Sequence, residues 1–317
     1  MIEIKRILCP IDFSEYSEHA LRYAMKMAKW YGASLQVLHV MPPMMPLATS
    51  ALAAAGHQLV RNNLKSTIER WQDPEVDVAA ELLESASTAE MIMRRADALD
   101  VDLIVAGSHG RKGMRRMLLG SVVEPLLHRC RRPVLIVPAG LNLARLERPV
   151  AFSRIICGVD FSDASVAALA YALSIAEECD ARLTIVNAIE MPPELINPPQ
   201  PPDFNIERAR GAVAAERLTK LRALIPEHAR DCCTVETAVV EGGASRQLLR
   251  FADERQADLV VLGVHGRNAL DLAVFGSTAK DVVTRAHCPV LIVPAGPRRQ
   301  RVDVPLRIRH AEPAFVV

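Results

Sequence analysis

Two glycine-rich segments carry residue types that could hold a phosphate group. Six of the fifteen glycines in the chain occupy matching positions in the two segments. Glycine lets a backbone approach a ligand closely, and N–H groups at the start of a helix, joined by a serine hydroxyl, can bind phosphate oxygens. Glycines also serve tight turns, so one such segment would be weak support, but the whole spacing is repeated and favours phosphate binding. The segments read Gly107-x-x-Gly110-x9-Gly120-Ser121 and Gly263-x-x-Gly266-x9-Gly276-Ser277.

An acidic residue follows each of two matching apolar segments. Asp12-Phe-Ser14 is repeated as Asp160-Phe-Ser162. A carboxylate at this place can accept hydrogen bonds from sugar hydroxyls, and a serine can cap the next helix. For the two serines, capping and ligand binding stay equal alternatives. For the two aspartates we favour ligand binding, because the end of the first strand in an open parallel sheet adjoins the ligand crevice.

The residues argue against a catalytic or metal centre. His109 and His265 lie between the glycines, but no second His, Cys or carboxylate recurs beside them at ligand spacing. The chain contains no Gly-Lys-Ser/Thr phosphate loop, no G-x-S-x-G segment and no repeated acid–histidine pair that would supply a general base. We assign no catalytic residue and no metal-ligating residue. A binding module is favoured over an enzyme.

The spacing of the motifs shows an internal repeat. The segment 133–140 recurs letter for letter at 289–296, whereas the two aspartates are 148 positions apart. The second copy has therefore gained about eight residues, which we expect in the proline-rich segment 191–202. We predict a first domain over residues 1–140, a linker over 141–151, a second domain over 152–296 and a C-terminal tail over 297–317.

Alternating short β-branched runs and helical spacing predict an α/β fold in each copy. The chain is expected to form two tandem, doubly wound, five-stranded parallel sheets of the Rossmann-like kind. The motifs then follow the first and fourth strands of each sheet, where ligands bind. In the first copy strands are expected at 4–11, 34–40, 76–83, 101–106 and 133–138, and helices at 15–31, 51–71, 88–99 and 117–129; strands of the second copy begin at 155, 183, 234, 257 and 289.

Composition excludes several other classes of protein. The 317 residues include 38 Lys+Arg against 37 Asp+Glu and only 4% aromatics, which argues against a nucleic-acid binder. Charges interrupt the first apolar run, and no stretch approaches 18 apolar residues, so we expect a cytoplasmic protein without a membrane partner. The seven cysteines show no C-x-x-C spacing. A redox role for the adjacent pair Cys232 and Cys233 stays open.

The aspartates, the glycine motifs and the repeated Pro-Val-Leu-Ile-Val-Pro strand resemble the universal stress protein (UspA-like) family in its tandem two-domain form. The resemblance covers about residues 1–140 and 152–296. It implies the strand order 3-2-1-4-5, pairing of the domains along their fifth strands, possible dimers, and binding of ATP, with Mg²⁺, with little or no turnover. The function expected is a nucleotide-sensing regulator of the stress response. The alternatives are a slow ATPase or phosphotransferase, and a dimerising scaffold that binds no nucleotide.

The resemblance also implies site residues in both copies. In the first copy it implies contacts to adenine and ribose from the end of strand one, a wall of the adenine pocket from strand two, and contacts to ribose and phosphates from the glycine motif. These residues are Pro10, Ile11, Asp12, Val40, Ala106, Gly107, Gly110, Gly120, Ser121 and Val122. The second copy offers Gly158, Val159, Asp160, Ala188, Leu262, Gly263, Gly266, Gly276, Ser277 and Thr278.

The loops between the glycines differ in charge. The first loop carries four cations within residues 111–116, whereas the second has Arg267 and Asp271. Charges within a Debye length of about 8 Å attract a triphosphate or repel it. We therefore expect the first site to bind ATP more tightly, with a merely solvated basic loop as the alternative.

Overall fold

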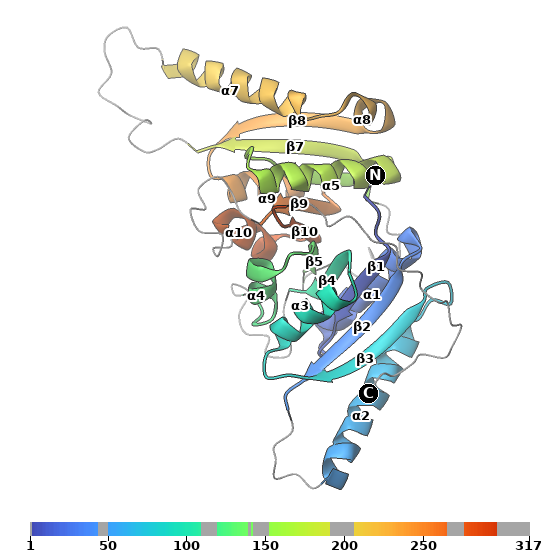
Figure 1. Ribbon diagram of the computed structural model, residues 1–317. Helices are drawn as coiled ribbons and strands as arrows, with labels where there is room; N and C mark the ends of the chain where they lie inside the picture. The colour runs from blue at the N-terminus through green and yellow to red at the C-terminus, as the bar shows by residue number, and fades with distance from the viewer. Residues whose placement is uncertain are drawn as a thin grey trace. The chain divides into compact units, whose positions relative to one another are not determined.

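The computed structural model describes residues 2–43, 50–108, 119–138, 141, 152–190, 206–264 and 276–296. They form two compact units (Figure 1). The first unit contains the described residues between Glu3 and Leu141, with Gly296, and the second contains those between Phe152 and Ala295, with Ile2. The proline-rich segment 191–202, the linker residues 142–151 and the tail 297–317 lie outside the described residues.

The first unit is a five-stranded parallel sheet with crossover helices. Its strand order is β3-β2-β1-β4-β5, and every neighbouring pair is parallel. The order 3-2-1-4-5 is thus confirmed. The elements are β1 (Arg6–Pro10), α1 (Glu15–Tyr31), β2 (Ser34–Met41), α2 (Ser50–Trp71), β3 (Val78–Glu84), α3 (Thr88–Ala98), β4 (Leu103–Gly107), α4 (Val123–Arg129) and β5 (Val134–Val137).

The second unit repeats this sheet with the order β8-β7-β6-β9-β10, again all parallel. It has one described helix that the sequence did not predict, the short α8. The segment between β7 and α7, residues 190–205, is eight residues longer than its counterpart 42–49. The elements are β6 (Arg154–Gly158), α5 (Asp163–Cys179), β7 (Arg182–Ile189), α7 (Ile206–Ala223), α8 (Glu227–Cys232), β8 (Thr234–Glu241), α9 (Ala244–Glu254), β9 (Leu259–Gly263), α10 (Ser277–Arg285) and β10 (Val290–Val293).

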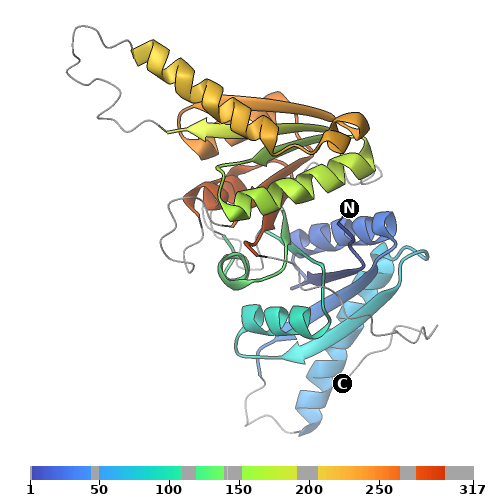
Figure 2. The same cartoon turned by 45° about the horizontal axis from the view of Figure 1, so that its top comes forward.

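Helices cover both faces of each sheet. In the first unit α1 packs against α2, and α3 packs against α4. Right-handed crossovers place these two pairs on opposite faces of the sheet (Figures 1 and 2). The central strands are therefore buried on both sides, and Ile7, Leu8 and Cys9 of β1 have no exposed surface. This explains why the strands read as continuous apolar runs.

Local signals fix where the first helix of each unit begins and ends. Ser14 and Ser162 are the N-caps of α1 and α5, because each hydroxyl accepts a hydrogen bond from an amide three residues later. Gly32 ends α1 in the left-handed conformation at φ 59°, and Asp180 ends α5 at φ 48°. The predicted range of α1, residues 15–31, is confirmed.

The predicted start of α4 is wrong. The sequence predicted a helix from residue 117, but residues 119–122 are not helical and α4 begins at Val123. The amide of Gly120 donates to the carbonyl oxygen of Ser108 at 3.2 Å, and this bond closes the base of the glycine loop. Because Gly120 is held by that contact, the helix can begin only beyond it.

A second pair of repeated acids has a structural role at the amino end of each sheet. Asp102 Oδ2 accepts hydrogen bonds from the amides of Lys5 and Arg6 at 2.7 and 3.0 Å. Asp258 Oδ2 accepts two amide hydrogen bonds at 3.0 Å in the second unit. These acids fix the start of the first strand and lie at the edge opposite to the candidate site. No helix in the described ranges is both long and apolar enough to cross a membrane.

Candidate functional site

The sheet register brings the predicted residues of the first unit to one edge. Pro10 lies opposite Leu38 of β2, and Leu8 lies opposite Ile104 of β4. Asp12 lies two residues beyond Pro10. It is therefore level with Val40 of β2 and lies next to the end of β4. The predicted first-unit residues with numbers up to 107 thus all lie at the carboxyl ends of β1, β2 and β4.

The second unit has the equivalent arrangement. Gly158 lies opposite Val186 of β7, and Cys157 lies opposite Val261 of β9. Asp160 follows β6 at the level of Ala188, next to the end of β9, which carries the predicted Leu262 and Gly263. Both units therefore present an aspartate at the carboxyl edge of the central strand, the place where open parallel sheets bind ligands.

Asp12 is held by hydrogen bonds within its own loop. Its Oδ1 accepts from the amide of Ser14 at 3.0 Å and from the Ser14 hydroxyl at 2.5 Å. Its own amide donates to Ser17 Oγ at 3.2 Å. Phe13 lies between them in the left-handed region at φ 62°, where bulky residues are uncommon. The carboxylate is therefore fixed in direction, and such local strain is a feature of ligand-binding loops.

The loop of the second unit repeats this geometry. Asp160 Oδ1 accepts from the amide and the hydroxyl of Ser162 at 3.0 and 2.6 Å, and the Asp160 amide donates to Ser165 Oγ at 3.3 Å. Phe161 has φ 67°. Each distance agrees with its counterpart in the first unit to within 0.1 Å. The sequence Asp-Phe-Ser-x-x-Ser thus specifies one loop conformation twice.

The sequence left capping and ligand binding as equal alternatives for Ser14 and Ser162, and the structure shows that both serines cap helices. Ser14 Oγ accepts from the amide of Ser17, and Ser162 Oγ accepts from the amide of Ser165, both at 3.2 Å. The same hydroxyls donate to the aspartates. Capping is confirmed for both serines, and through the aspartates they also orient the candidate ligand-binding carboxylates.

Two residues that sequence reasoning missed support these loops from the second strand. His39 Nδ1 donates to the carbonyl oxygen of Ile11, and Asn187 Nδ2 donates to that of Val159, both at 2.7 Å. Their side chains are buried, with 7% and 1% of their surface exposed. A polar residue near the carboxyl end of the second strand in both copies, 148 positions apart, is the signal that could have found them.

Gly107 and Gly263 have a packing role. A Cβ on Gly107 would lie 2.7 Å from the carbonyl oxygen of Tyr16, and a Cβ on Gly263 would lie 2.6 Å from the carbonyl carbon of Ala164. Neither distance occurs for real Cβ atoms, so these glycines allow the first turns of α1 and α5 to approach β4 and β9. Their predicted contact with ribose stays a prediction.

The glycines at the far end of each loop use their amides within the protein. Gly120 donates to Ser108, and Gly276 donates to the carbonyl oxygen of Val264 at 3.0 Å. These two N–H groups have partners within the protein, and the predicted phosphate contacts of Gly120 and Gly276 stay predictions. The neighbouring predicted residues remain accessible: Ser121 and Ser277 are exposed, and Val122 and Thr278 are half-buried. Gly110, Gly266, His109, His265 and the cations of 111–116 lie outside the described residues.

The cysteines do not form a reactive centre at this edge. Burial raises the pKa of Cys9 in β1 and of Cys157 in β6 far above the ordinary value for a thiol. In the adjacent pair, Cys232 is exposed, but Cys233 is buried and desolvation raises its pKa. High thiol pKa values disfavour the thiolate, which is the reactive form.

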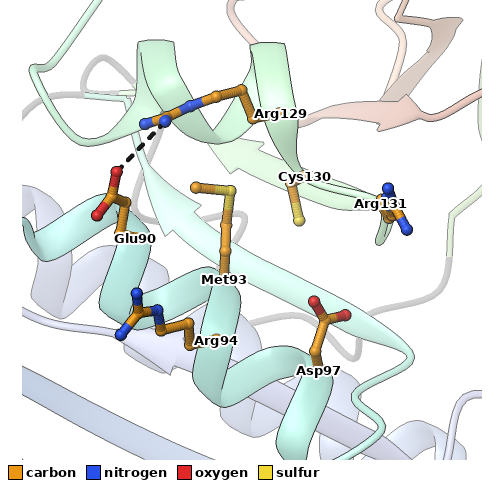
Figure 3. A pocket seen from close by; sticks show the side chains of 7 residues that line it. All are labelled: Glu90, Met93, Arg94, Asp97, Arg129, Cys130 and Arg131. Carbon is orange, nitrogen blue, oxygen red and sulfur yellow. Dashed lines mark hydrogen bonds and ion pairs between the residues drawn. The ribbon is translucent and has the colours of Figure 1, made fainter.

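The cavity between α3 and α4 of the first unit lies away from this edge (Figure 3). It has a volume of about 230 Å³. The residues that line it come from α3 and from the end of α4: Glu90, Met93, Arg94, Asp97, Arg129, Cys130 and Arg131. Since Cys130 and Arg131 lead into the amino end of β5, the cavity adjoins the opposite end of the sheet from Asp12.

Two parallel sheets of the same strand order, each with the same acidic loop at its carboxyl edge, define a tandem doubly wound α/β protein. A sequence model of the Universal stress protein family matches residues 3–138 and again residues 151–294. The chain belongs to the universal stress protein family and contains its domain twice.

Some relatives match this chain over nearly their whole length. The chain is 27% identical over 298 residues to a universal stress protein of Mycolicibacterium smegmatis, covering 90% of this chain and 96% of that one. It is 23% identical over 305 residues to the universal stress protein E homolog of Haemophilus influenzae, covering 92% and 97%. The crystal structure of a universal stress protein from Archaeoglobus fulgidus shares the fold, with a TM-score of 0.63, 20% identity and coverage of 92% and 98%.

Proposed function

We propose that each unit binds one adenine nucleotide, ATP with Mg²⁺, at the carboxyl edge of its sheet. The observation that carries this proposal is the acidic loop, which has the same hydrogen bonds in both units. A structural role alone would not require a strained residue between the acid and its capping serine at both places. The protein then acts as a nucleotide-sensing regulator of the stress response with little or no turnover.

The aspartates are the proposed ribose ligands. Each is half-buried, and one carboxylate oxygen is oriented by the capping serine. A carboxylate accepts hydrogen bonds from a pair of ribose hydroxyls, and hydrogen bonds to a charged group contribute about 1.5–3 kcal/mol. Val40 and Ala188, at the ends of β2 and β7, form the proposed walls of the adenine pockets, and Pro10, Ile11, Gly158 and Val159 complete them.

The start of the helix after the glycine loop is the proposed phosphate-binding part. Ser121 and Ser277 are exposed and offer a hydroxyl and an amide each, with Val122 and Thr278 next to them. The oxygens of the triphosphate suit Mg²⁺, which prefers oxygen ligands and arrives with substrate phosphates. When bound, Mg²⁺ would neutralise part of the phosphate charge.

Other aspects of the function remain predictions. These are the tighter binding at the first site, pairing of the domains, a homodimer and a cytoplasmic location. A universal stress protein that is 26% identical over 46% of this chain, with a TM-score of 0.32, has been solved in complex with cAMP.

Mass spectrometry of small molecules released by heating the purified protein tests the proposal. We expect adenine nucleotide in the wild-type sample and less of it from the variants Asp12→Asn and Asp160→Asn. Asparagine keeps an Oδ1 that can accept from Ser14 or Ser162, so the loop is preserved while the charge is lost. Wild-type protein that is folded, carries no nucleotide and takes up none from millimolar MgATP contradicts the proposal and favours the scaffold alternative.

A phosphate-release assay separates the binding module from a slow ATPase. We expect little or no sustained phosphate release with saturating MgATP. Release that continues over many turnovers, and that Asp12→Asn and Asp160→Asn abolish, would establish the ATPase alternative instead.

A further inference from the structure

The cavity between α3 and α4 has a charge pattern that the proposed nucleotide sites do not explain. Two acids and three arginines line it, from α3 and from the end of α4 (Figure 3). Glu90 Oε1 lies 3.5 Å from Arg129 Nη1, so this pair is neutralised within the cavity. Asp97 is paired from outside, because its Oδ1 lies 3.3 Å from the Nε of Arg132.

This pairing leaves two guanidinium groups at the cavity without a carboxylate. Arg94 and Arg131 have no ion-pair partner within 4.0 Å in the described part of the chain, and both are exposed. Figure 3 shows them on either side of Met93 and Cys130. Burial raises the pKa of Cys130 to about 11, so its thiol is neutral at physiological pH and adds no negative charge. The cavity therefore has a net positive lining.

The second unit provides an internal comparison. Arg250 and Arg285 occupy the positions equivalent to Arg94 and Arg129, 156 residues later. Each is paired with an acid four residues away on its own helix: Arg250 with Glu254 at 3.6 Å, and Arg285 with Asp281 at 3.3 Å.

The first unit lacks these acids. The positions equivalent to Glu254 and Asp281 are Ala98 and Pro125. His287 stands where the first unit has Arg131. Arg94 and Arg129 thus lack the acids that pair with Arg250 and Arg285, whereas Arg246, at the position of Glu90, has no ion-pair partner within 4.0 Å among the described residues of the second unit.

The size and chemistry of the cavity restrict its ligand. Pockets that bury drug-sized ligands have volumes of about 300–1,000 Å³. At about 230 Å³ the cavity suits a molecule smaller than a nucleotide. Guanidinium groups match phosphate oxygens in geometry and bind them in a bidentate manner.

We propose that the cavity between α3 and α4 binds a small phosphate-bearing ligand, inorganic phosphate or a small phosphate monoester, through Arg94 and Arg131. This site is separate from the proposed ATP sites, and it is proposed for the first unit, where Arg94 lacks the acid that pairs with its counterpart Arg250.

Titration of the full-length protein with inorganic phosphate, followed by the NMR signals of arginine Nε–Hε groups, tests the proposal. Saturating MgATP is present throughout, so that phosphate cannot report on the strand-edge sites. We expect saturable shifts of the Arg94 and Arg131 signals. The variants Arg94→Gln and Arg131→Gln should each weaken phosphate binding at least tenfold, and the matched variant Arg250→Gln in the second unit should not change it.

Further arms identify the source of the phosphate group. Glycerol phosphate is titrated in parallel with inorganic phosphate. Tighter binding of glycerol phosphate would indicate a phosphate monoester as the ligand, and tighter binding of inorganic phosphate would indicate the free ion. The proposal is overturned if the signals do not saturate by 10 mM phosphate, if chloride at the same ionic strength shifts them equally, or if Arg250→Gln weakens binding as much as Arg94→Gln. If ATP fails to bind at all, the phosphate titration can still be interpreted, because its variants lie outside the strand-edge sites.

Discussion

The acidic loops of the two units have the same conformation although their supports differ. His39 holds the peptide before Asp12, and Asn187 holds the peptide before Asp160, each through a hydrogen bond of 2.7 Å. The lesson is that the Asp-Phe-Ser-x-x-Ser sequence determines the loop locally, while the second strand needs only to supply a donor for one buried carbonyl group. An imidazole and an amide each supply this donor at the same distance.

The supports differ in what else they contact. The His39 ring packs against Phe13 in a tilted geometry, with 4.4 Å between the ring centroids and 37° between the ring planes. Asn187 Oδ1, in contrast, is buried and has no hydrogen-bond partner among the described residues, and Phe161 faces the guanidinium of Arg217 at 5.5 Å instead. A buried acceptor without a partner costs about 1–3 kcal/mol. We infer that the second loop is held less firmly than the first.

The largest expected effect is a loss of stability when Gly107 or Gly263 is replaced, because these glycines pack in the same way in both units. Gly107→Ala and Gly263→Ala should each reduce the free energy of unfolding of their unit by about 1–3 kcal/mol, because the added Cβ collides with the backbone of α1 or α5. Urea denaturation measures this. Gly211→Ala in α7 is the control: nothing lies within 4 Å of its Cβ, and alanine should stabilise the helix by up to about 1 kcal/mol. Neutral Gly107→Ala and Gly263→Ala would refute the packing role.

The next prediction separates the two supports. His39→Leu removes the donor for the Ile11 carbonyl group and the ring contact with Phe13, and should cost about 2 kcal/mol of unfolding free energy. Asn187→Leu removes the donor for Val159 but also an unpaired buried acceptor, so its cost should be about 1 kcal/mol. Equal costs, or a larger cost for Asn187→Leu, would show that Asn187 Oδ1 has a partner in solution.

The N-caps should behave alike. Ser14→Ala and Ser162→Ala each remove a cap from a 17-residue helix and should destabilise their units by about 1 kcal/mol. Thermal unfolding followed by circular dichroism measures both variants. A difference between them of more than half of this effect would argue against the equivalence of the two loops.

The smallest expected effect is a difference between the two units in how their stability depends on pH. In the first unit hydrogen bonding to Lys29 lowers the pKa of Asp73, and hydrogen bonding to Asp73 raises the pKa of Lys29. The contribution of Asp73 to stability is therefore complete above its ordinary pKa of 3.8 and is lost as the pH falls through its lower value in the folded protein. In the second unit Glu177 stands in the place of Lys29.

Carbon-13 NMR titration of the Asp73 carboxyl group provides the test. Lys29→Ala should return the pKa of Asp73 toward its ordinary value. An unchanged pKa in that variant would show that the ion pair seen at 2.9 Å does not persist in solution.

The sequence predicted the features that depend on local residues. The bounds of α1 follow from helical spacing and the repeated acidic loops from the Asp-Phe-Ser motif, whereas the strand order was implied by the resemblance to the universal stress protein family. The start of α4 was wrong because the bond between Gly120 and Ser108 joins residues across a loop. His39 and Asn187 were missed because their burial and their distant carbonyl partners arise only once β1 and β2, or β6 and β7, lie side by side.

Counting bound nucleotides by native mass spectrometry tests the central claim most directly. Wild-type protein with MgATP should carry two ATP molecules per chain, Asp12→Asn and Asp160→Asn should each carry one, and the double variant should carry none. A double variant that still binds two ATP molecules, or a wild-type chain that binds none at 1 mM, a concentration of the order of upper KM values, would contradict the account.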